Sequence, residues 1–208
     1  MDTLVKICGI RDVASAEAAV SFGADYLGFV FAESKRRINI EKAKEIIKYI
    51  PSNVAKVGVF VNESIETLEY TALECGLDYV QLHGKESSEF CKKLKVPVIK
   101  SFSIKEKKDI NNITEYEVKA YLVDSDTGKY AGGSGVTFNW ELLNNIDESI
   151  KKKLILAGGL NADNVLEAIE KIKPFAVDVS SGVETEGRKD LAKIEKFIKI
   201  IKNKNKTF

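Results

Sequence analysis

The first stretch that could do chemistry is a short apolar run that ends in a thiol at Cys8 and is followed by Gly9. This pattern predicts a β-strand whose last side chain faces a ligand, because strand side chains alternate and a glycine permits close approach. The same alternation places Lys6 on the face of Cys8. Since a cation beside a thiol favours the thiolate, Cys8 is a candidate reactive group, with a buried packing cysteine as the alternative.

Two loops near the C-terminus combine glycines with hydroxyl side chains. Gly158 and Gly159 follow one apolar run, and Ser180, Ser181 and Gly182 follow the next. Glycines expose backbone N–H groups, serines add hydroxyls, and a short helix after the second run would add its positive N-terminal dipole. The two loops therefore predict a phosphate site, with ordinary turn chemistry as the alternative.

The elements that must position these residues alternate between strands and helices. Apolar runs predict strands at residues 5–10, 25–31, 55–61, 79–84, 96–102, 120–124, 154–159 and 175–180. Helices are expected up to residue 22 and at residues 41–50, 65–75, 87–94, 105–113, 141–145, 163–172 and 191–201, with a glycine-bearing loop at 125–135. Near-continuous apolar strands are typical of parallel sheets covered on both faces.

Eight such strand-and-helix units close most naturally into a barrel. We therefore predict an α/β fold, a (β/α)8 TIM barrel that forms a single domain over residues 1–208. An open doubly wound sheet is the alternative. No GxGxxG motif follows the first strand, which argues against dinucleotide binding.

A barrel places its functional site at the C-terminal ends of the strands. Cys8 and Asp124 end the first and sixth strands, and the two predicted phosphate loops lie on the arc between them. A thiol and a carboxyl on two sides of a small substrate can remove one proton and donate another. Together with the phosphate loops, this pair predicts a sugar-phosphate isomerase.

Composition narrows the classes of partner. The 208-residue chain has a net charge of +1, so no overall field recruits nucleic acid or a membrane surface. No run approaches the roughly 20 apolar residues of a membrane span, and the N-terminus lacks a signal-peptide pattern, so we expect a cytoplasmic protein. The three cysteines are odd in number and show no ligand spacing, so neither disulfides nor a metal site is expected.

Period-2 alternation also predicts an ion pair inside the barrel. Lys6 lies two residues below Cys8 on the first strand, and Asp178 lies two residues below Ser180 on the eighth. Barrel closure makes these two strands neighbours. Because an unpaired buried charge is costly and a paired one is tolerable, we expect Lys6 to contact Asp178 beneath the site.

Motifs from Lys6 to Phe197 carry a resemblance to a known family. They are Lys6–Ile10, Gly28–Phe31, Ser34–Arg36, Val59–Asn62, Gln81–Gly84, Gly132–Gly135 with Phe138 and Trp140, Ala157–Leu160, and Asp178–Glu184. As a set they resemble the phosphoribosylanthranilate isomerase family of tryptophan biosynthesis. The resemblance implies a cofactor-free Amadori rearrangement of N-(5-phosphoribosyl)anthranilate, a small phosphorylated substrate, to the 1-deoxyribulose phosphate.

The resemblance also implies roles for individual residues. Asp124 matches the family's general acid, which opens the furanose ring, and Cys8 matches its general base, which takes the C2 proton. Arg36 matches an arginine near the anthranilate carboxylate, but Arg37 stands where the family's pattern has an aromatic residue, so either arginine could face the site.

Gln81 and His83 share one face of the fourth strand and are candidates for the wall of the substrate site. His83 is the chain's one histidine, and a neutral, hydrogen-bonded ring is a simpler interpretation than a catalytic base. The residue roles give no prediction of oligomeric state, and a monomer or a homodimer is equally compatible with them.

Two other functions stay open at this point. Indole-glycerol-phosphate synthase, a neighbouring barrel of the same pathway, would need a catalytic Lys and Glu at strand ends, and Lys6 lies too deep for that role. A barrel that binds a phosphorylated ligand without turnover is the non-enzymatic alternative, and it would tolerate loss of Cys8.

Overall fold

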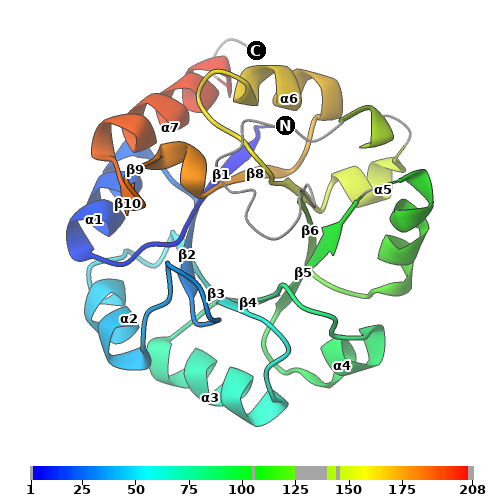
Figure 1. Ribbon diagram of the computed structural model, residues 1–208, viewed down its shortest axis with the longest axis horizontal. Helices are drawn as coiled ribbons and strands as arrows, with labels where there is room; N and C mark the ends of the chain where they lie inside the picture. Colours follow the sequence, from blue (N-terminus) through cyan, green and yellow to red (C-terminus); the bar gives the residue numbers. More distant parts are fainter. Residues whose placement is uncertain (1, 105, 125–139, 144–145, 206–208) are drawn as a thin grey trace.

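Eight parallel strands close into a barrel that is surrounded by helices (Figure 1). The computed structural model describes residues 2–104, 106–124, 140–143 and 146–205. The barrel strands are β1 Leu4–Cys8, β2 Tyr26–Val30, β3 Ala55–Phe60, β4 Tyr79–Leu82, β5 Val98–Ser103, β6 Ala120–Asp124, β7 Leu154–Leu156 and β8 Ala176–Val179. Each strand pairs with its sequence neighbour, and β1 pairs with β8. The predicted TIM barrel is confirmed, and the open sheet is wrong.

Helices follow most strands and cover the outside of the barrel (Figure 1). The α-helices are α1 Val13–Phe22, α2 Ile40–Ile47, α3 Ile65–Cys75, α4 Ser88–Lys93, α5 Glu148–Lys151, α6 Val165–Ile172 and α7 Leu191–Asn205. Polar side chains cap several of them, as Asp12 does by accepting a hydrogen bond from the backbone of Ser15. Gly23 ends α1 in a left-handed conformation (φ 102°), which glycine adopts at little cost.

Several segments differ from the expected elements, and helix α5 Glu148–Lys151 is one that was not predicted. The polar stretch at 105–113 forms a 3₁₀ helix, η1 Lys107–Glu115, in place of an α-helix, and η2 Trp140–Leu143 stands where a weak helix was expected. A short hairpin, β9 Glu184–Thr185 with β10 Arg188–Lys189, was not predicted because each strand has only two residues. The predicted loop at 125–135 and the Gly132–Gly135 motif lie outside the described residues.

The interior of the barrel changes from apolar to polar along the strands. Near the N-terminal ends of the strands it is filled by an apolar cluster that includes Val57, Ile99 and Ala176. Above it, Lys6 and Gln81 are buried polar side chains, 0% and 2% exposed. The polar layer therefore lies directly beneath the strand ends that the sequence assigned to function.

The outer face of the strands packs against the helices through a larger apolar cluster, which includes Phe29, Leu68 and Phe197. Among the helices that the structure describes, none combines the length and the apolar character that crossing a membrane requires.

Candidate active site

Cys8 is the last residue of β1 and is 8% exposed. Its partner on β2 is Gly28. A Cβ added at Gly28 would lie 2.8 Å from Cys8 Sγ and 3.1 Å from Lys6 Nζ. A glycine at this position therefore makes room inside the barrel for the thiol and the ammonium together.

The predicted ion pair beneath Cys8 is confirmed. Lys6 Nζ lies 2.8 Å from Asp178 Oδ1, across the β1–β8 seam where the two residues are in register. Burial disfavours the ammonium, but Asp178 and Cys8 outweigh that effect, so the pKa of Lys6 is raised. The pair satisfies a cation that would otherwise be costly in the barrel interior.

Lys6 favours the Cys8 thiolate, as the sequence predicted, but it does not decide the net direction of the Cys8 pKa shift. Burial raises the pKa of the Cys8 thiol, and the opposing effects of Lys6 and Lys189 do not fully offset it. The sequence identified the nearby cation but could not give the extent of desolvation, which depends on the packing around the thiol.

Arg36 and not Arg37 lies beside β1. Its Nε and Nη2 atoms donate to the two carboxylate oxygens of Glu184 at 2.7 Å each. Gly9 (φ 83°) makes this possible, because a Cβ there would lie 2.6 Å from Arg36 Cδ. Arg37 instead pairs with the exposed carboxylate of Glu33.

Sequence reasoning missed Lys189 as a residue of this site. Its side chain is 2% exposed and its ammonium lies 2.8 Å from Glu184 Oε1. The same Nζ atom donates to the carbonyl oxygen of Ser180 at 2.9 Å. The one available signal was Gly187, which could turn the chain so that Lys189 faces Glu184 in a hairpin.

The two predicted phosphate loops are in direct contact. A Cβ at Gly182 would overlap the carbonyl oxygen of Leu160, so only glycine permits this approach. Gly158 and Gly159 have φ angles of 86° and 64°, a backbone conformation that glycine favours. The short helix expected after β8 is present as the 3₁₀ turn η3, Ser181–Val183. Ser180 Oγ donates to the carbonyl oxygen of Cys8 at 3.1 Å, which joins this region to β1.

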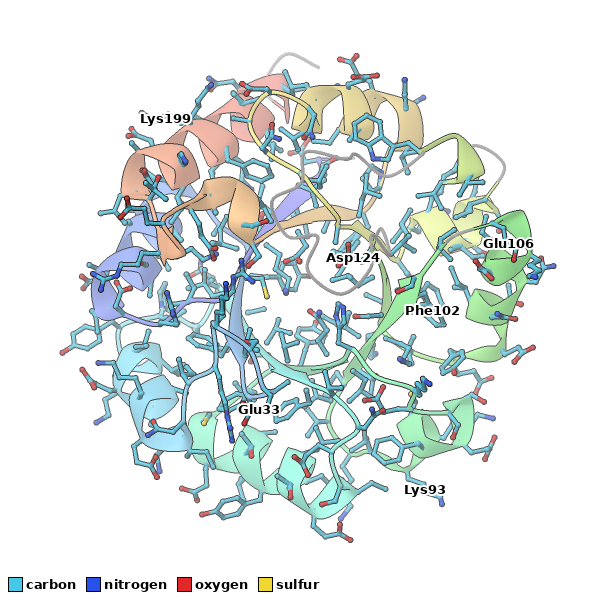
Figure 2. All side chains as sticks on the ribbon, in the orientation of Figure 1. Glu33, Lys93, Phe102, Glu106, Asp124 and Lys199 are labelled. Carbon is cyan, nitrogen blue, oxygen red and sulfur yellow. The ribbon has the colours of Figure 1, made fainter. Side chains whose placement is uncertain are left out.

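Asp124 ends β6 at the inner edge of the barrel (Figure 2). Its Oδ2 atom lies 4.0 Å from His83 Nε2. The other ring nitrogen of His83 lies 3.2 Å from Gln81 Nε2. Burial lowers the pKa of His83, which favours the neutral ring. The structure thus brings together the three polar residues expected from the fourth and sixth strands.

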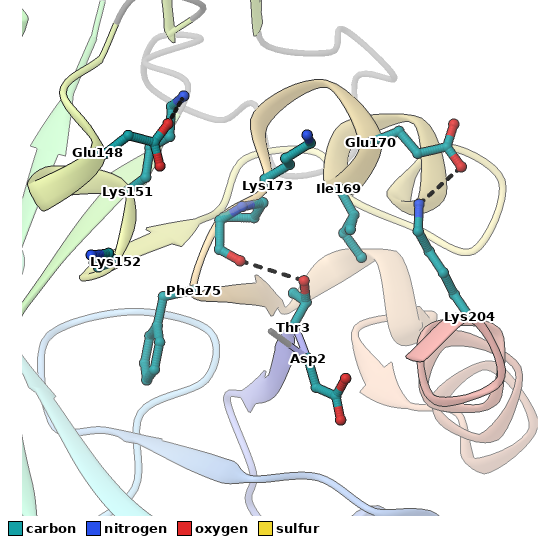
Figure 3. Close-up of a pocket in the computed structure, with 11 residues that line it drawn as sticks. Asp2, Thr3, Glu148, Lys151, Lys152, Ile169, Glu170, Lys173, Phe175 and Lys204 are labelled. Carbon is teal, nitrogen blue, oxygen red and sulfur yellow. Dashed lines mark hydrogen bonds and ion pairs between the residues drawn. The ribbon is translucent and has the colours of Figure 1, made fainter. Parts of the chain in front are cut away.

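A separate hollow lies at the opposite, N-terminal end of the barrel (Figure 3). It has a volume of about 540 Å³ and is lined by residues that include Thr3, Lys173 and Phe175. None of the candidate site residues lines it. Within the described part of the chain, no group of three or more His, Cys, Asp or Glu side chains is arranged to hold a metal ion.

Comparisons with known proteins identify the family. The model of N-(5'-phosphoribosyl)anthranilate isomerase matches residues 5–200. The chain belongs to the phosphoribosylanthranilate isomerase family. It is 54% identical over 194 residues to the N-(5'-phosphoribosyl)anthranilate isomerase of Bacillus cereus strain B4264, covering 93% of this chain and 95% of the relative.

Solved structures agree with this assignment. The phosphoribosylanthranilate isomerase of Thermotoga maritima superposes with a TM-score of 0.87 at 43% identity, covering 97% of this chain and 99% of that one. Another structure of the family contains reduced 1-(o-carboxyphenylamino)-1-deoxyribulose 5-phosphate and matches at TM-score 0.83 and 39% identity, with the same coverage. These matches favour the isomerase over the neighbouring synthase.

Proposed function

We propose that this protein converts N-(5-phosphoribosyl)anthranilate into 1-(2-carboxyphenylamino)-1-deoxyribulose 5-phosphate. The observation that carries the proposal is the family match over residues 5–200, since it spans both Cys8 on β1 and Asp124 on β6. The barrel directs both side chains to the C-terminal ends of its strands, where barrel enzymes hold their substrates. We propose further that the whole chain acts as one catalytic domain.

Asp124 acts first, as the general acid. Its protonated carboxyl donates a proton to the furanose ring oxygen while the C1–O bond breaks and the anilino nitrogen supplies the electrons for an iminium. The side chain is 34% exposed, so a substrate at the strand ends can reach it. Neutral His83 beside it is placed to line the site without adding a competing positive charge.

Cys8 then acts as the general base. Its thiolate takes the proton from C2. The C2–H electrons form the C1=C2 double bond while the C=N π electrons return to nitrogen, which gives an enamine that tautomerises to the ketone. Because the pKa of Cys8 is raised, only a minor fraction of the free enzyme holds the thiolate at neutral pH. The neighbouring cations increase that fraction relative to a thiol that is buried alone.

The remaining candidates bind the two charged ends of the substrate. Backbone N–H groups at Gly158, Gly159 and Gly182 receive the phosphate together with the hydroxyl of Ser181 and that of Ser180, which turns from the Cys8 carbonyl to do so. Arg36 receives the anthranilate carboxylate, since guanidinium geometry matches a carboxylate and Glu184 leaves its Nη1 atom free of that ion pair. Gln81 orients His83 on the site wall.

The decisive experiment follows the fluorescence of the anthranilate group after the phosphoribosyl substrate is added. Loss of the signal with formation of the deoxyribulose product supports the isomerase. Binding of the substrate without product, in the wild type as in Cys8→Ala, would instead support the non-catalytic phosphate-binding barrel. We also propose that the protein is cytoplasmic and has no nucleic-acid partner. It is either a monomer or a homodimer, and sedimentation at several protein concentrations distinguishes these two states.

A further inference from the structure

Lys189 carries a buried ammonium that the proposed proton transfers do not use. Its side chain is 2% exposed, yet its Nζ atom has three oxygen neighbours. It donates to the Ser180 carbonyl at 2.9 Å, lies 3.4 Å from Ser180 Oγ and bonds Glu184 Oε1 at 2.8 Å. Through Ser180, whose hydroxyl donates to the Cys8 carbonyl, this ammonium is connected to the backbone of the proposed base.

The β9–β10 hairpin holds Lys189 in this place. Lys189 pairs with Glu184 in its antiparallel register, and the turn residues Glu186 and Gly187 both have positive φ angles, 50° and 73°. Such a turn matches the twist of a two-residue hairpin. Arg11 anchors the hairpin by donating to the Gly187 carbonyl at 2.6 Å. A hairpin fixed in this way presents one buried cation at a defined position.

Charged groups from several elements surround Cys8. Lys6 and Lys189 favour its thiolate, and Asp178 opposes it. The pKa of Arg36 is raised chiefly by its hydrogen bonds to Glu184, with a smaller contribution from Cys8. This cluster holds three cations and two carboxylates. The cations are Lys6, Lys189 and Arg36, and the carboxylates are Asp178 and Glu184. Lys6 pairs with Asp178, whereas Arg36 and Lys189 share Glu184, so the cluster carries one excess positive charge to which Lys189 contributes. His83 is neutral and adds no positive charge to the cluster.

We propose that Lys189 is a positioning residue, which adds positive charge to the cluster around Cys8 and holds Ser180 and Glu184 in place. The proposal rests on the proposed role of Cys8 as the base. In a buried site a nearby charge acts strongly, because little water screens it. Lys189 thereby offsets part of the desolvation that raises the pKa of Cys8.

The test titrates the Cys8 thiolate directly by its ultraviolet absorbance, taken as the difference between each protein and its Cys8→Ser counterpart. In Lys189→Met the midpoint should rise, because a cation that favours the thiolate is removed. Lys189→Arg keeps the charge and should stay near the wild type. Lys193→Met is the matched control, since Lys193 is exposed and donates to the backbone carbonyl of Glu184 at 2.8 Å. Its midpoint should not move.

A double variant separates charge from damage to the fold. Lys189→Met with Glu184→Gln removes one cation and one carboxylate, so the excess charge is restored and no buried carboxylate loses its partner. Its midpoint should return toward the wild type, whereas kcat/KM stays low because Arg36 loses its anchor. An unchanged midpoint in Lys189→Met, or no recovery in the folded double variant, would overturn the proposal. Absence of isomerase activity in the wild type would overturn the proposed function alone, because the titration needs no substrate.

Discussion

Lys6 and Asp178 are separated by most of the chain, yet Lys6 Nζ and Asp178 Oδ1 lie 2.8 Å apart inside the barrel. The first and last strands of the barrel meet here, with Lys6 and Asp178 in register. The ammonium is fully buried and the carboxylate is 10% exposed. The contact thus closes the barrel with an ion pair placed directly under the proposed base.

We predict that Lys6→Met destabilises the protein by about 3 to 5 kcal/mol, because it leaves the Asp178 carboxylate buried without its partner. The same variant should raise the pKa of Cys8, since Lys6 is the strongest influence that lowers it. Urea unfolding measures the first effect and thiolate absorbance the second.

The double variant Lys6→Met with Asp178→Leu should recover much of that stability, because a buried ion pair can often be replaced by apolar side chains of similar volume. Activity should not recover. Strictly additive losses of unfolding free energy in this cycle would show that the two side chains do not act as a pair.

Cys8→Ala should lower kcat by about 10²-fold to 10⁴-fold while the protein stays folded, the usual effect of removing a general base. Near-normal turnover would exclude the role given to Cys8. In the wild type, the ultraviolet titration should place the Cys8 midpoint in alkaline solution, because burial raises the pKa of the thiol. A midpoint in mildly acidic solution would contradict that direction.

Glu184 makes stability depend on pH in acid. Burial favours its neutral form, but hydrogen bonds from Arg36 and Lys189 lower its pKa from 4.5 to about 2. Because the pKa of Glu184 is lower in the folded state, its ionised form stabilises the fold. This contribution to the free energy of unfolding is fully present above pH 4.5 and is lost as the pH falls from 4.5 to about 2. The shift corresponds to on the order of 3 kcal/mol.

Urea unfolding of Glu184→Gln should therefore show a flatter dependence on pH across that window than the wild type. Glu167→Gln is the control, because Glu167 forms an exposed i,i+4 pair with Lys171, and such pairs contribute little. Equal pH slopes in the wild type and Glu184→Gln would refute the prediction.

The strands and their closure could be predicted because each apolar run of strand length has few alternatives, and parallel strands need helices between them. The Lys6–Asp178 ion pair could be predicted in a similar way, since the alternation of strand side chains fixes which residues face inward. Lys100 shows where this reasoning stops. It is buried in β5 and pairs with Glu86 at 3.1 Å, but Glu86 comes from the loop after β4, and no periodicity places a loop residue.

Lys189 was missed for a related reason. Arg188, Lys189 and Asp190 form a charged run, and such runs are usually solvated. Only the hairpin turns Lys189 inward, and its two-residue strands are too short to give a period-2 signal. The sequence likewise could not predict whether the pKa of Cys8 is raised or lowered, because the direction depends on how completely neighbouring side chains exclude water from the thiol.

Ser180→Asp should raise KM for the phosphorylated substrate, since a fixed negative charge would repel the phosphate. Ser180→Ala removes the hydroxyl without adding charge and serves as the control. Steady-state kinetics on both variants measures the effect. An unmoved KM in Ser180→Asp would place the phosphate elsewhere on the barrel.

Gly182→Ala tests whether contact between the two phosphate loops matters for binding. An added Cβ would overlap the Leu160 carbonyl oxygen, and because a backbone atom cannot rotate away, the loops after β7 and β8 must separate. Backbone N–H groups on both loops would then no longer converge on one phosphate, so KM should rise severalfold, with a smaller effect on kcat.

Gly76→Ala is the matched control, because Gly76 ends α3 at φ 63° with no atom within 4 Å of an added Cβ. That substitution strains the backbone and should cost about 1 kcal/mol of unfolding free energy, but it leaves the loops in place. If both variants lose similar stability and only Gly182→Ala loses affinity, the loop contact is what binds the phosphate. An unchanged KM in a folded Gly182→Ala protein would rule that out.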